Sequence, residues 1–169
     1  KTLANQPQDR FLTELNQLAS DESLPLMTRL HATRALSRGD TTLSDSSLEL
    51  MIEILHKKAD VTVRAEAIQL LTQSRLTAGK RIQLAEVAHL FSPVEIPSLM
   101  QIFRTLRSEE EARSFGLALV ESPFIASFDR ERIEQIFRPF PEALPDELKE
   151  MLEQLNQEQS NRAERIESY

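Results

Sequence analysis

The residues best suited to bind a metal or transfer a proton are three histidines, His31, His56 and His89. Glu86 and His89 have the Glu-x-x-His spacing that places a carboxylate and an imidazole on one helix face, as in di-iron bundles. Such a site needs two copies of this motif and two further carboxylates, and we interpret Glu86 and His89 as a single copy. We therefore expect the histidines to lie at the solvent or at an interface, and we expect no metal site.

Charged side chains offer two further candidates for chemistry. Residues 109–111 are consecutive glutamates, which would either bind a cation or form the acidic first turn of a helix; we favour the helix turn, because the helix dipole stabilises carboxylates there. Arg34 and Arg38 lie one helical turn apart and, with Arg29, would line a face that receives an anionic partner. The alternative is that these arginines are solvated, apart from one that bonds to a neighbouring repeat.

Other kinds of site lack the residues they require. The chain has no Cys, which excludes a disulfide, a thiolate metal site, a Cys nucleophile and covalent haem attachment within its 169 residues. It has three glycines and contains no Gly-x-Ser-x-Gly, P-loop or dinucleotide-binding motif. The sequence therefore predicts a protein that is not an enzyme, with no catalytic residue and no cofactor held by this chain.

Composition and charge narrow the class further. Apolar residues make up 40% of the chain and charged residues 28%. Gly is scarce, Trp is absent and no alternating strand pattern occurs, so we expect an all-α fold. The net charge is −7, of which residues 142–169 carry −5, and no basic stripe is present, which argues against nucleic acid as a partner. No stretch approaches the roughly 20 apolar residues of a membrane span. The chain begins at Lys1 without a leader pattern, which indicates a processed protein or a segment of a longer one.

The apolar and capping patterns predict a series of helices. We expect them at about 9–19, 25–38, 44–58, 60–74, 77–91, 95–107, 108–121, 129–137 and 145–167. Their expected N-caps include Ser44, Asp60, Asp129 and Ser108, the last in a capping box with Glu111. The first helix should bury Phe11, Leu12, Leu15 and Leu18, and the last should bury Leu144, Leu148, Met151, Leu152 and Leu155. After Leu155 the apolar stripe stops, so we expect the polar end to connect to a domain outside this chain.

A period of 35 residues organises these helices. Leu36, Leu71 and Leu106 recur at that interval, and Arg29 and Ala32 have their counterparts in Arg64 and Ala67. A period of this length with two helices per unit is typical of an α-solenoid. We therefore predict one domain, 1–169, folded as an α-α superhelix of about four helix pairs. Its repeats would be 9–38, 44–74 and 77–107, followed by a divergent unit, 109–138, and a long terminal helix, 145–167.

Residues 59–71, ADVTVRAEAIQLL, resemble the second helix of a HEAT repeat, in which an Asp precedes Val-Arg, small Ala positions and a closing Leu. Asp60, Val63, Arg64, Ala67 and Leu71 fill these places. The resemblance implies a HEAT- or armadillo-like fold in which the Arg bonds between adjacent repeats. The first copy has Pro25 in place of the capping Asp, and the third has Ser98-Leu99 in place of Val-Arg.

Residues 122–155 are similar to a helical region of large planctomycete and verrucomicrobial proteins, where it precedes a C-terminal c-type haem-binding domain. The matching features are Ser122-Pro123, a short helix from Asp129, the Phe140-Pro141 break and a long final helix. The resemblance implies an extracytoplasmic bacterial parent protein linked to electron transfer, with haem c in a domain downstream of this chain.

Two functions follow from these patterns. The first is a non-catalytic scaffold or spacer that holds a haem domain relative to other modules of the same parent chain. The second is a free-standing HEAT-repeat module that binds another protein or a peptide. Arg29, Arg64, Arg34 and Arg38 are the candidate contacts, either between repeats or with a partner.

Overall fold

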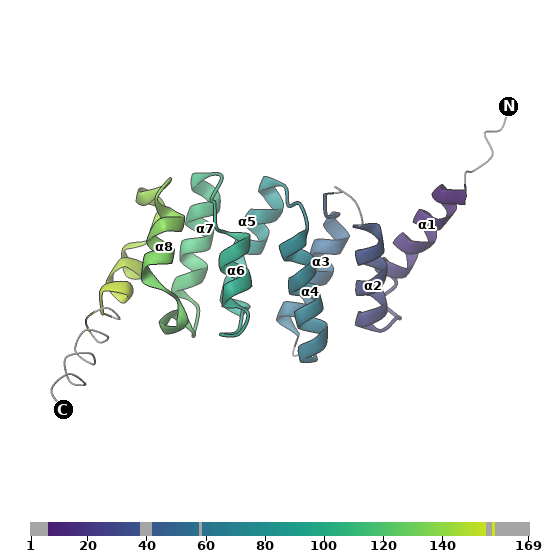
Figure 1. Cartoon of the computed structure of the whole chain (residues 1–169), viewed down its shortest axis with the longest axis horizontal. Helices are drawn as coiled ribbons and strands as arrows, with labels where there is room; N and C mark the ends of the chain where they lie inside the picture. Colours follow the sequence, from purple (N-terminus) through teal and green to yellow (C-terminus); the bar gives the residue numbers. More distant parts are fainter. Residues whose placement is uncertain (1–6, 38–41, 58, 155–156, 158–169) are drawn as a thin grey trace. The chain divides into compact units, whose positions relative to one another are not determined.

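The structure is a computed structural model that describes residues 7–37, 42–57, 59–154 and 157, and within these residues all regular elements are helices (Figure 1). One isolated β-bridge joins Thr42 and Arg75. The prediction of an all-α fold is thus confirmed for the described part of the chain. Contacts divide the chain into two compact units, 1–80 and 81–169, which meet within one helix and are described separately below.

The first unit contains two antiparallel helix pairs. Helix α1 (Pro7–Ser20) packs on α2 (Leu26–Leu36), and α3 (Asp45–His56) packs on α4 (Val61–Gln73). Helix α2 also contacts α4, so the two pairs share one core. The fully buried side chains Leu30, Leu43, Leu48, Met51 and Ile54 fill that core.

Helix starts in this unit follow the expected capping chemistry. The Ser44 hydroxyl accepts a hydrogen bond from the Ser47 backbone N–H at 3.2 Å, and the Asp60 carboxylate accepts one from Thr62 at 2.8 Å. Helix α2 begins after Pro25 without a side-chain cap. The predicted end of that helix at Gly39-Asp40 lies outside the described residues.

The apolar face of α1 is less buried than predicted. Of the four residues expected to pack, Leu15 is buried, whereas Phe11, Leu12 and Leu18 are 59%, 47% and 42% exposed. The expectation was wrong for these three because α1 packs on α2 and its partner covers only the strip around Leu15.

The second unit is built around α7 (Glu109–Val120). Helix α5 (Ala78–Glu86), which spans the boundary between the units, leads into a 3₁₀ turn, η1 (Ala88–Leu90), and α6 (Ile96–Ile102) follows. After α7 come η2 (Ile125–Ser127), α8 (Arg130–Phe137), η3 (Pro141–Ala143) and a helical stretch at 146–154. Asp129 caps α8 as predicted, accepting a hydrogen bond from the Glu131 N–H at 3.0 Å. Helix α7 contacts both η1 and η3.

Two helices of this unit are shorter than predicted. The helix expected over 77–91 ends at Glu86 and tightens into η1, where Leu90 and Phe91 donate to carbonyls three residues back. The helix expected over 95–107 ends at Ile102, because the buried Arg81 guanidinium takes the carbonyl oxygens of Ile102 and Thr105. Long-range bonds of this kind leave no local sequence pattern.

A row of stacked aromatic rings forms the centre of the second unit. The ring centroids of Phe103 and Phe115 are 4.4 Å apart, and those of Phe115 and Phe137 are 5.9 Å apart. Next to this row, α7 has a glycine, Gly116, where a Cβ atom would lie 2.5 Å from Cδ of Pro145. Gly116 therefore lets the start of the 146–154 helix approach α7 closely.

The last helix is described only in part. Leu148 and Leu152 are buried, as predicted, and Leu144 and Met151 are half-buried. Leu155 and most of the polar stretch 156–165 lie outside the described residues. The single array over 1–169, its repeat boundaries and the connector role of its end stay predictions.

Candidate functional site

Arg29 and Arg64, which hold the same place in the 35-residue period, make equivalent hydrogen bonds. Arg29 Nε donates to the carbonyl of Ala19 at 3.2 Å, and Arg64 Nη1 donates to that of Leu55 at 2.9 Å. Each carbonyl lies one residue before the last residue of the preceding helix. Helix C-termini leave carbonyls unpaired and carry negative partial charge, so a guanidinium stabilises them in two ways.

The bonds to Ala19 and Leu55 each lie within one predicted repeat, whereas the HEAT-based expectation concerns bonds between repeats. The Arg64 bond to Leu55 joins two helices of one predicted repeat, 44–74, and the expected bond of Arg64 to a neighbouring repeat stays a prediction. Arg29 also makes a contact between predicted repeats, because its Nη1 donates to Glu53 of α3 at 3.5 Å. In the third copy, Leu99 stands at the place of Arg64 and is fully buried.

Arg34 bridges α2 and α4 through two polar partners. Its Nη1 lies 2.5 Å from Glu66 Oε1 and its Nη2 donates to Gln69 Oε1 at 3.1 Å. The charge of Arg34 is thus offset inside the first unit, and Arg29 is buried. Arg38 lies outside the described residues, so the predicted face of Arg29, Arg34 and Arg38 is not shown as one surface.

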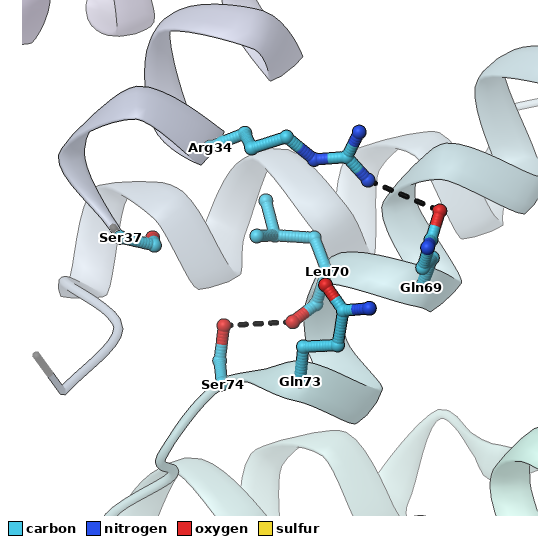
Figure 2. Close-up of a pocket in the computed structure, with 6 residues that line it drawn as sticks. All are labelled: Arg34, Ser37, Gln69, Leu70, Gln73 and Ser74. Carbon is cyan, nitrogen blue, oxygen red and sulfur yellow. Dashed lines mark hydrogen bonds between the residues drawn. The ribbon is translucent and has the colours of Figure 1, made fainter. Parts of the chain in front are cut away.

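A polar pocket of about 400 Å³ lies beside Arg34, between the C-terminal halves of α2 and α4. Figure 2 shows Arg34 reaching from α2 towards Gln69 on α4, with Gln73 one turn further along. The pocket is lined by Arg34, Ser37, Gln69, Leu70, Gln73 and Ser74. Leu70 is buried, while both glutamines are exposed. This pocket presents amides and hydroxyls, groups that recognise neutral polar ligands by hydrogen bonds.

The hydroxyls of this pocket are already fixed by the helices. Ser37 Oγ donates to the Thr33 carbonyl at 2.9 Å, and Ser74 Oγ donates to the Leu70 carbonyl at 2.7 Å. Each hydroxyl oxygen keeps its acceptor capacity. Among the described residues, the Gln73 amide makes no hydrogen bond, so it offers a donor and an acceptor to a ligand.

The most buried ionic group of the described residues escaped sequence reasoning. In the second unit Arg81 Nε donates to Glu111 Oε1 at 2.7 Å, and the two side chains are 6% and 1% exposed. Arg81 Nη1 and Nη2 donate to the Ile102 and Thr105 carbonyls, both at 2.9 Å. The guanidinium carbon lies 5.3 Å from the ring centre of Phe103.

The capping box predicted for Ser108 and Glu111 was half right. Ser108 Oγ accepts from the Glu111 N–H at 3.1 Å, as in a capping box. The Glu111 carboxylate, however, accepts from the Arg107 N–H at 3.0 Å and from Arg81. Arg81 draws that carboxylate inward, so Glu111 is a buried counter-charge, while Glu109 and Glu110 are exposed on the first turn. The sequence signal for this ion pair was Arg81, an arginine on the apolar face of α5 beside Leu84 and Ala85.

The histidines do not assemble a metal site in the described part of the chain, where no group of three or more His, Cys, Asp or Glu side chains is placed to hold an ion. His31 and His56 are exposed. His89 lies with Nδ1 buried and 3.7 Å from Glu121 Oε2, at the end of α7. His89 lies in η1, after the end of α5, and Glu86 is exposed.

A second Glu-x-x-His, Glu53 and His56 on α3, was overlooked in the sequence. Glu53 is engaged by Arg29 and by Lys57, which forms an ion pair with it. Lys57, and more weakly Arg29, holds the pKa of the Glu53 carboxyl below its ordinary value. This carboxylate thus has cationic side chains as its partners.

In comparisons with protein-family models, curated proteins and solved structures, the chain gives no match. Among the helices that the structure describes, none combines the length and apolar character that crossing a bilayer requires. Covalent haem attachment would need cysteines, which this sequence lacks, so its residues do not fit that group.

Proposed function

We propose that this chain is a non-catalytic helical-repeat scaffold, folded as an α-α superhelix of HEAT type. The observation that carries the proposal is the equivalence of Arg29 and Arg64. Residues 35 positions apart make the same bond to the last turn of the preceding helix, in two successive helix pairs. A sequence period that corresponds to a repeated bond is what a solenoid built from duplicated pairs requires.

Small-angle X-ray scattering tests the superhelix. A compact globule of this length has a radius of gyration of about 15 Å. A superhelix should give a clearly larger radius and a rod-like cross-section region in the scattering curve. A radius near the compact value would contradict the proposal.

In its first form, the scaffold is a spacer within a larger haem-binding protein. The similarity of residues 122–155 to the region before a c-type haem domain supports this form, and the capped helix α8 and the break at Phe140-Pro141 have the expected order. The test is the parent reading frame, which should encode Cys-x-x-Cys-His within about 100–150 residues after Tyr169. A frame that ends shortly after Tyr169 would rule the spacer out.

In its second form, the scaffold is a module that binds another protein or a peptide. The pocket beside Arg34 favours this form, because it presents exposed amides next to a buried leucine, between two helices that contact each other. Binding of a defined peptide at this pocket, measured by calorimetry, would support the module. If the pocket binds no polypeptide, the binding module is ruled out and the spacer is the form of the proposal that stands.

A further inference from the structure

We propose that the pocket between α2 and α4 binds an extended, uncharged polypeptide segment. The side-chain amides of Gln69 and Gln73 would form hydrogen bonds with the backbone of this segment. The inference rests on the second form of the proposed function and specifies its site and ligand. Scattering tests the scaffold separately, so a failure of this site leaves the superhelix untouched.

The first argument is spacing. Gln69 and Gln73 are four residues apart on α4, so their Cα atoms are offset by about 6 Å along the helix axis. Alternate residues of an extended chain are about 6.7 Å apart. Each glutamine amide has both a donor and an acceptor, as does each peptide unit. The two amides can therefore pair with every second residue of an extended segment that runs along α4.

The second argument is the supply of unused hydrogen-bonding groups. The Gln69 oxygen already accepts from Arg34, which orients that amide and leaves its NH₂ group available. The Gln73 amide is exposed and makes no hydrogen bond in the described part of the chain. The buried Leu70 lies between them in sequence and lines the pocket, so a ligand side chain would meet an apolar surface there.

The third argument is charge. Arg34 is the cation of the pocket lining, and Glu66 lies 2.5 Å from it, so the pair is neutral overall. An acidic ligand would have to compete with Glu66 for the guanidinium. A neutral backbone loses no such interaction. Binding should therefore change little between low and high salt.

The experiment starts from a phage-displayed library of random linear peptides selected on the full chain. Enriched peptides are synthesised and titrated by calorimetry, and the side-chain NH₂ signals of Gln69 and Gln73 are followed by NMR. Gln73→Ala should weaken binding about tenfold, the value of one or two lost hydrogen bonds. Gln17→Ala, an exposed glutamine on α1, is the matched control and should leave the affinity unchanged.

A scan of backbone N-methyl groups along the peptide separates backbone recognition from side-chain recognition. Methylation should abolish binding with a period of two residues, and the intervening positions should tolerate it. Because the Gln73 side chain makes no hydrogen bond to any described residue, its variant should melt like the wild type. The proposal is overturned if no peptide is enriched, if Gln73→Ala binds as the wild type does, if affinity falls steeply with salt, or if the shifted signals map to α1.

Discussion

Arg81 and Glu111 are a buried ion pair in which both charges also bind the backbone. Arg81 donates to two carbonyls at the end of α6, and Glu111 accepts from the Arg107 N–H before α7. The pair therefore joins three segments, α5, the end of α6 and the start of α7. Because both side chains are nearly completely buried, water cannot solvate the charge that remains if one partner is removed.

Arg81→Met should lower the free energy of unfolding by about 3–5 kcal/mol, because Glu111 is left buried without a counter-charge. The double variant Arg81→Met/Glu111→Leu should recover part of this loss. Urea denaturation measures both. Arg113→Ala is the control, since its pair with Glu109 is about two-thirds exposed, and it should cost less than about 1 kcal/mol. A single-variant loss as small as that of the control would show that the pair is not structural.

Arg64→Ala should destabilise the protein by about 1.5–3 kcal/mol, the value of a hydrogen bond that involves a charged group. Arg29→Ala, which also loses Glu53, should cost at least as much. Thermal melting followed by circular dichroism checks both variants. An unchanged midpoint for Arg64→Ala would contradict a structural role for the bond to Leu55.

Gly116→Ala and Gly79→Ala should have effects of opposite sign. Gly79 is the second residue of α5 and nothing lies within 4 Å of a Cβ there, so Gly79→Ala should stabilise by about 0.4–1 kcal/mol, because alanine restricts the unfolded chain more than glycine does. At Gly116 the new methyl would meet Pro145, and the clash should cost about 1–3 kcal/mol. Replacing Pro145 with Ala in the same chain should relieve part of this loss. Equal midpoints for the two glycine variants would contradict the close approach.

The cap at Asp60 should make stability depend on pH. The backbone N–H of Thr62 is the main cause that holds the pKa of Asp60 below its ordinary value of 3.8. A lowered folded-state pKa means that the carboxylate stabilises the fold above its ordinary pKa and that this contribution is lost as the pH falls through the folded-state value.

Asp60→Asn keeps a capping oxygen but cannot titrate, so it isolates this effect. The difference in unfolding free energy between wild type and Asp60→Asn should shrink as the pH is lowered from neutrality to about pH 2. Parallel curves across that range would show that the cap does not titrate with folding.

Local features were the ones that the sequence could predict. Ser44, Asp60 and Asp129 cap helices because a short polar side chain bonds to a backbone N–H only two or three residues away. The pattern is complete within one turn, so no tertiary information is needed. The same holds for the apolar stripe of the last helix, in which Leu148 and Leu152 are buried.

Features that depend on distant segments were missed or mistaken. Arg81 and Glu111 are 30 residues apart, and no local rule indicates which glutamate of 109–111 turns inward. The early end of α6 follows from the same arginine. Likewise, the pattern of α1 predicts an apolar face but not how much of it a neighbour covers, so the exposure of Phe11 and Leu18 could not be read in advance. The candidate pocket needs α2 and α4 side by side, and only the structure provides that.

The bonds of Arg29 to Ala19 and of Arg64 to Leu55 span ten and nine residues, and each lies within one helix pair. A gene segment that encodes one pair therefore carries both the donor and its acceptor. Duplication of such a segment would add a donor together with its acceptor, and deletion would remove both. Neither event would require a compensating change elsewhere. This self-contained linkage gives the chain a simple route to becoming longer or shorter by whole pairs.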